Sequence, residues 1–163
     1  MHATDDMLEQ AALFAGLCAE ERARIGRLGS DLHVKSGDVL FRLGDEATTL
    51  FVIASGAVEL TFPLCVMKEV RDVRVQVLGP GDALAWSALV PPHRLTMGAR
   101  VTVSGRLLAL PRESLLSDLV AEPRAGLVLM ANLARVVGGR LLEAQALWMR
   151  EVQRHVSETY DEA

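Results

Sequence analysis

The sequence has few of the residues on which several kinds of protein depend. Its two cysteines, Cys18 and Cys65, lack Cys-x-x-Cys spacing, so we expect reduced structural thiols rather than a disulfide framework or a zinc site. No apolar run approaches the roughly 20 residues of a membrane-spanning helix, and the acidic start of the chain is unlike a signal peptide. These absences predict a cytoplasmic protein with no membrane partner.

Basic charge is scarce too. The 163 residues carry a formal net charge of -4, which offers no general attraction to nucleic acid. The sequence stops at Ala163 in an acidic segment, which supplies no further domain to enter a DNA groove. We therefore expect no direct DNA binding.

Clustered catalytic and metal-binding residues are also missing. The histidines stand singly, at His2, His33, His93 and His155. Without His-x-His or His-Glu-x-x-His spacing no metal-dependent enzyme is indicated, and Ser87 lacks the glycines of a nucleophile elbow. His93 could in principle ligate a haem iron, although a lone loop histidine is more often solvated. The sequence thus predicts neither an enzyme nor a resident cofactor or metal.

What is present is a globular composition with helices at both ends. Half of the residues are apolar, enough for one domain with its own core. Residues 1–31 are predicted to form two helices, the first running toward Gly16 and the second covering residues 20–28. The second has one apolar side, so both are expected to pack on the rest of the chain.

The period of the apolar residues changes over residues 32–110. Short runs alternate between apolar and polar side chains, most regularly over residues 72–77, and turns are predicted at glycines such as those in residues 55–56 and 104–105. Many short antiparallel strands indicate a sandwich or barrel rather than a parallel sheet. We predict a mainly β fold with flanking helices, a double-stranded β-helix or jelly roll.

The last third is expected to be helical over residues 111–158, with a frayed tail at 159–163. A long helix begins near Pro123, and two adjacent glycines, Gly138 and Gly139, lie within it as either a close-packing site or a flexible joint. An apolar stripe follows it for about six turns and needs a partner helix as its cover. The predicted homodimer interface consists of Met130, Leu133, Val137, Leu141, Ala144 and Trp148.

The stretch over residues 79–97 is the best candidate for ligand contact. Gly79, Pro80 and Gly81 predict a tight bend, and residues 83–89 have too few β-branched side chains for another strand. One or two helical turns are expected there. A short helix between strands directs unpaired backbone N–H groups toward one place, which suits an anion.

Several motifs in order resemble the cyclic nucleotide-binding domain family, over residues 13 to about 140. The matching stretches are residues 13–17, 36–45, 50–58, 78–82 and 106–112. The resemblance implies a β-roll flanked by helices, with residues 79–97 as the phosphate-binding cassette. It also implies that the long helix is the dimerisation element, as in catabolite-activator-like members of the family.

The cassette departs from the family pattern in its chemistry. The resemblance places Trp86 where the family has a glutamate for the ribose 2'-hydroxyl, a charge-assisted bond worth about 1.5 to 3 kcal/mol. Ala85 replaces a glycine, which adds a methyl group near the ligand. The arginine that pairs with the cyclic phosphate falls near Leu95, one residue from Arg94, which either faces the pocket or is solvated. Cyclic AMP is therefore expected to bind weakly or not at all.

Two functional hypotheses follow. In the first, the chain is a regulatory module that senses a small anionic ligand and signals through the dimeric helix. In the second, it is a ligand-free dimerisation domain or an interaction domain for an unidentified protein partner. Trp86 would stack on a ligand ring or plug the cavity. The predicted ligand-binding residues are Ala85, Trp86, Ser87, Ala88, Leu89, Arg94 and Thr96.

Overall fold

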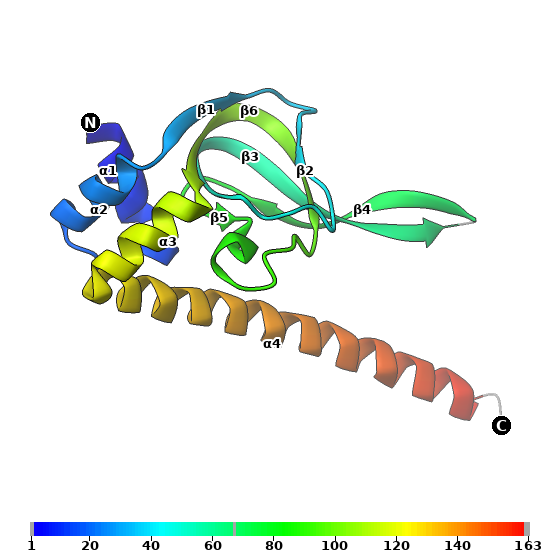
Figure 1. Cartoon of the computed structure of the whole chain (residues 1–163). Helices are drawn as coiled ribbons and strands as arrows, with labels where there is room; N and C mark the ends of the chain where they lie inside the picture. The colour runs from blue at the N-terminus through cyan, green and yellow to red at the C-terminus, as the bar shows by residue number, and fades with distance from the viewer. Residues whose placement is uncertain (1, 67, 162–163) are drawn as a thin grey trace.

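A six-stranded antiparallel sheet winds the middle of the chain into a β-roll in the computed structural model, which describes residues 2–66 and 68–161 (Figure 1). The sheet order is β1-β6-β3-β4, with β2 paired to β6 and β5 paired to β3. This confirms the predicted mainly β roll. The strands are β1 (Ser30–Val34), β2 (Val39–Phe41), β3 (Thr49–Val66), β4 (Glu69–Leu78), β5 (Ala83–Leu84) and β6 (Gly98–Pro111).

The two longest strands, β3 and β6, run through glycines that the sequence predicts to be turns. Both turn predictions are wrong, because Gly56 and Gly105 mark a place where the strands pass each other closely. A Cβ atom on Gly105 would lie 2.0 Å from the Ser55 carbonyl oxygen, and the register of the β3–β6 pair shifts on both sides of Ser55. Glycine is required here for close backbone approach within bent strands.

Apolar side chains fill the inside of the roll. Ile53, Leu84 and Leu107 are fully buried there, and the stacked rings of Phe41 and Phe51, with centroids 6.3 Å apart, touch both this cluster and a second one. The second cluster joins the outside of the roll to the helices. The two cores therefore meet at the aromatic pair, close to the segment that follows β5.

Helices enclose one end of the roll and extend beneath it (Figure 1). The first helix stops at Gln10, so the expected continuous helix toward Gly16 is broken into a helix and a 3₁₀ turn. α1 begins at His2 and α4 continues to Asp161, so residues 159–161, which were expected to fray, are helical. The helical elements are α1 (His2–Gln10), η1 (Ala12–Phe14), α2 (Ala19–Gly26), η2 (Trp86–Leu89), α3 (Arg112–Ala121) and α4 (Pro123–Asp161).

The long helix α4 packs on its own chain with its first half only. Ala125, Leu129 and Leu133 are buried in the core, and Leu133 is 2% exposed. Its predicted place in the dimer interface is therefore wrong, because its side chain is already covered within one chain. Further along α4, Leu141 and Trp148 are exposed. By length and composition alone the segment Pro123–Ser157 could cross a membrane, which no single apolar run in the sequence indicates.

An ion pair connects α2 to the start of α4. Arg124 Nη1 lies 2.5 and 2.6 Å from the two carboxylate oxygens of Glu21, and the Cys18 backbone N–H donates to Glu21 Oε2 at 2.8 Å. The pKa of Glu21 is lowered from 4.5 to about 2. The hydrogen bond from Arg124 is the main cause, and the hydrogen bond from the Cys18 backbone is the second. The carboxylate is thus stabilised in its charged form when the protein folds.

Replacing Glu21 by glutamine is expected to lower the free energy of unfolding at pH 7 by about 1 kcal/mol, a small value because Arg124 is 65% exposed and solvent screens the pair. Because the folded-state pKa is depressed, the contribution is complete above pH 4.5 and is lost as the pH falls toward 2. Urea denaturation at pH 7 and pH 2.5 measures the difference. An equal effect of the substitution at both pH values contradicts the assignment, and Glu20→Gln is the matched surface control.

Candidate functional site

A pocket of about 210 Å³, here called the central pocket, lies between the roll, the segment after β5 and α4. Figure 1 shows this segment, in green, between the strands and the helix below them. Strands of the roll, η2 and α4 all contribute to its wall. The lining residues are Phe41, Leu60, Ala85, Trp86, Ser87, Leu95, Thr96, Met97, Val137, Arg140 and Leu141.

A left-handed residue shapes the wall at η2. The short strand β5 pairs with β3, and Ala85 then takes φ 61° and ψ 33°, a conformation that costs an alanine about 1 kcal/mol. The chain turns at Ala85 into the 3₁₀ segment, so the expected one or two helical turns are a single 3₁₀ element. The Ala88 N–H donates to the Ala85 carbonyl at 3.0 Å, so the expectation that it is free for an anion is wrong.

The structure separates the predicted ligand-binding residues into two groups. Ala85, Trp86, Ser87 and Thr96 line the central pocket. Ala88 and Leu89 are buried in the helical core instead and are not among the lining residues. Whether the four lining residues hold a ligand stays a prediction.

Arg94 also lies outside the lining of the central pocket. Its guanidinium is exposed, and Nη1 donates to the Gly44 carbonyl at 3.3 Å. An isolated β-bridge between Arg94 and Glu46 fixes the backbone in this position. The loop therefore directs the one basic side chain of the cassette toward the β2–β3 connection.

Trp86 separates the central pocket from a smaller one of about 50 Å³, which also contains Asp82. The indole is half-buried and packs against the helical core. It leaves open space on both sides, so it forms a wall of the central pocket and does not fill it. The interpretation of Trp86 as a plug is therefore wrong, and stacking of its indole on a ligand ring stays a prediction.

Arg140, from α4, is the only charged residue among the described residues that line the central pocket. It also borders the small pocket. Burial lowers the pKa of its guanidinium, while the charges of Asp82 and Glu143 act in the opposite direction. Within residues 2–66 and 68–161 it has neither an ion pair nor a hydrogen bond to a side chain. A cation that burial has partly desolvated favours an anionic partner.

Helical periodicity places Arg140 on the face of α4 that packs on the roll. It lies seven residues after Leu133 and four after Val136, on the side of α4 that faces the roll. From the sequence alone, Arg140 is predicted to be a surface charge or to reach a pocket across a dimer. The structure places it beside the pocket of its own chain. The apolar lining residues Phe41 and Leu60, from strands β2 and β3, and Met97, just before β6, carry no such signal.

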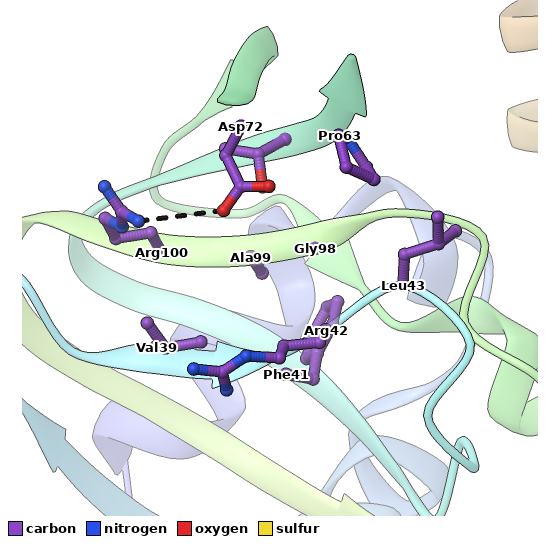
Figure 2. Close-up of a pocket in the computed structure, with 10 residues that line it drawn as sticks. Val39, Phe41, Arg42, Leu43, Pro63, Asp72, Gly98, Ala99 and Arg100 are labelled. Atoms are coloured by element: carbon purple, nitrogen blue, oxygen red, sulfur yellow. Dashed lines mark ion pairs between the residues drawn. The ribbon is translucent and has the colours of Figure 1, made fainter. Parts of the chain in front are cut away.

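A second depression, the outer pocket, has a volume of about 280 Å³ and lies where β2, β6 and the β3–β4 hairpin meet (Figure 2). Two of its lining residues are basic. Arg100 pairs with Asp72 at 3.8 Å, and Figure 2 shows Arg42 directed away from that pair. Because these cations are solvent-exposed and one is already paired, the outer pocket is the weaker candidate for an anion.

Metal chemistry has no obvious support in this site. Across residues 2–66 and 68–161 no group of three or more histidine, cysteine, aspartate or glutamate side chains could hold a metal ion. His93 has φ 55°, and its Nδ1 lies 3.3 Å from the Ser87 carbonyl oxygen. This contact closes the loop that follows η2.

A family profile described as Cyclic nucleotide-binding domain matches residues 31–120. The chain is 32% identical over 149 residues to Glutaminase 1 of Bradyrhizobium diazoefficiens. The matched region covers 89% of this chain and 22% of the glutaminase. The chain is 29% identical over 110 residues to the cGMP-dependent protein kinase egl-4 of Caenorhabditis briggsae, with coverages of 67% and 14%. The chain thus spans about a fifth or less of the length of these relatives.

Solved structures agree with this similarity. The Catabolite Activator Protein of Thermus thermophilus superimposes with a TM-score of 0.73 at 27% identity, covering 85% of this chain and 62% of that one. The N-terminal domain of a transcriptional regulator from Streptomyces coelicolor gives a TM-score of 0.71 at 28% identity, with coverages of 82% and 92%. The profile includes η2 and all strands of the roll except the first residue of β1.

Proposed function

Because this chain belongs to the cyclic nucleotide-binding domain family, a family of regulatory domains, we propose that it senses a small anionic ligand in the central pocket and signals through α4 of a homodimer. One observation carries the proposal. Val137 and Leu141 line the pocket and also lie on the stripe of α4 that continues beyond the roll. A ligand that contacts them therefore acts directly on the helix surface that a second copy would cover.

The surface proposed for pairing is the α4 seam, consisting of Met130, Val137, Leu141, Ala144 and Trp148. Met130 and Val137 are seven residues apart and the other neighbours are three or four apart, which places all five on one helix face. Met130, Leu141 and Trp148 are 41%, 57% and 64% exposed in the single chain. A second α4 would remove this apolar area from water, which gives the pairing its driving force.

Replacing Trp148 by glutamate is expected to convert the dimer into a monomer, because it puts a charge among the apolar side chains at the distal end of the α4 seam. Sedimentation equilibrium at micromolar concentrations measures the change. Val120→Glu, on α3, is the matched control, since Val120 is 80% exposed and lies off the seam. A monomeric unmodified protein, or an unchanged dimer in the Trp148 variant, contradicts the proposed seam.

The alternative function is a ligand-free dimerisation or protein-interaction domain. The altered cassette favours it, since Trp86 offers only a donor nitrogen and Arg94 lies outside the central pocket. The two functions differ in one measurable respect. Only a sensor changes its dimerisation constant when a small molecule occupies the pocket. We further propose a cytoplasmic location and no direct DNA binding. The activities of the longer relatives are not assigned to this chain.

A further inference from the structure

We infer that the ligand is a monocarboxylate with a compact apolar body, and that Arg140 is the residue that binds its carboxylate. The inference rests on the proposed sensing function and specifies its ligand class. It depends on three features of the central pocket: its charge, its polar groups and its size.

The charge of the lining points to a single anionic group. Arg140 is the only ionisable residue among the eleven described residues that line the pocket, and none of these eleven is an aspartate or a glutamate. One guanidinium balances one negative charge, and its planar pair of N–H groups matches a carboxylate with two parallel hydrogen bonds. A ligand with two or more charges would leave charge uncompensated in a partly buried site.

The surroundings of Arg140 leave its binding groups available. The opposite charges that act on it come from Asp82 and Glu143, yet neither reaches the 4 Å of an ion pair. Asp82 is already occupied in the turn before β5, where its Oδ2 accepts the Gly79 N–H at 2.8 Å. A carboxylate in the central pocket would therefore become the nearest acceptor for the guanidinium.

The polar groups of the central pocket do not suit a sugar. Ser87 and Thr96 supply hydroxyl groups and Trp86 one N–H donor, but no carboxylate is present to accept a bond from a ribose hydroxyl. The rest of the wall is apolar, with Phe41, Leu60 and the side chains of α4 facing the space. An aromatic or branched aliphatic body would bury its surface there at little polar cost.

The size of the central pocket limits that body. At about 210 Å³ it is smaller than the roughly 300 to 1,000 Å³ of sites for drug-sized ligands. A cyclic nucleotide, which joins a base, a ribose and a phosphate, is drug-sized. A single ring or short branched chain with one carboxylate fits the smaller volume.

The test compares 3-phenylpropanoate with 3-phenylpropanamide, which has the same body without the charge. Isothermal titration calorimetry and ligand-observed NMR measure binding to the full chain. We expect the carboxylate to bind at least tenfold more tightly than the amide, and Arg140→Met to remove that preference. Arg140→Lys, which keeps the charge without the planar fork, should give an intermediate loss, and Arg150→Met, on an exposed position of α4, should leave affinity within twofold.

The outcomes separate this inference from the proposed function. Equal binding of the amide, unchanged binding in Arg140→Met with a native circular dichroism spectrum, or no binding of 3-phenylpropanoate at millimolar concentration overturns the ligand class. Cyclic AMP that binds more tightly than about 10 μM and requires Arg140 also overturns the class, while leaving the sensing function standing. Arg140-dependent binding of the carboxylate that leaves the dimerisation constant unchanged supports the class and contradicts the sensing function.

Discussion

Replacing Asn132 by leucine is expected to destabilise the protein by about 3 kcal/mol, because a buried and a partly buried carbonyl group lose their donor together. Asn132 lies on α4 and is 5% exposed. Its Nδ2 donates to the Leu13 carbonyl at 3.1 Å and to the Ala15 carbonyl at 2.7 Å, and its Oδ1 accepts from Arg135 at 2.9 Å. The side chain thus fastens the segment after α1 to the long helix.

The matched control for this substitution is Ala131→Leu, which adds the same side chain at the neighbouring exposed position and should change stability by no more than about 0.5 kcal/mol. Asn132→Asp offers a second variant, since a carboxylate cannot donate to either carbonyl at pH 7. Urea denaturation followed by circular dichroism gives the free energies. If Asn132→Leu is as stable as the control, the two hydrogen bonds do not hold the N-terminal segment.

Replacing Gly105 by alanine is expected to cost about 3 kcal/mol or more, because the added methyl group has nowhere to go. Its Cβ would lie 2.0 Å from the Ser55 carbonyl oxygen and 2.8 Å from the Gly56 Cα. Both are backbone atoms of β3, so relief requires the two strands to separate and breaks hydrogen bonds of the roll. Thermal and urea denaturation measure the loss.

Gly79→Ala is the matched control for the strand crossing. A Cβ atom at Gly79 has no neighbour within 4 Å, so we expect a change of no more than about 0.5 kcal/mol. The contrast between the two substitutions tests whether contact between β3 and β6, rather than the general flexibility of glycine, makes Gly105 necessary. Equal stability of the two variants would refute the crossing geometry.

Alternation of apolar residues was enough to predict the roll, since one buried face leaves a period of two in each strand. It could not distinguish a turn from a crossing, because Gly56 and Gly105 satisfy either geometry. The difference depends on contacts between residues about fifty positions apart. Such contacts leave no local pattern in the sequence, so the continuous strands β3 and β6 had to be observed.

The glycine-proline-glycine bend predicts a ligand-contact segment and the family resemblance identifies it as the cassette, but neither identifies the cation of the central pocket. Sequence alignment through a loop indicated Arg94, and the backbone bridge to Glu46 directs that side chain away from the central pocket. Arg140 lies far along the chain, and helical periodicity indicates only which face it occupies. What lies opposite that face is a property of the tertiary structure. The apolar stripe of α4 likewise has two environments that the sequence does not distinguish. Leu133 is buried in the core of its own chain, whereas Leu141 and Trp148 are exposed.

The adjacent glycines of α4 lie just where its packing on the roll ends. Added Cβ atoms at Gly138 and Gly139 would meet nothing within 4 Å, so neither glycine is required for packing within one chain. Each lowers helix propensity by about 1 kcal/mol relative to alanine. Residues 142–157 beyond them are exposed, so this part of α4 gains no stability from packing on the roll. Association with a second chain would stabilise this part of α4 as a helix. Dimerisation and local folding of the helix would then be coupled in one equilibrium.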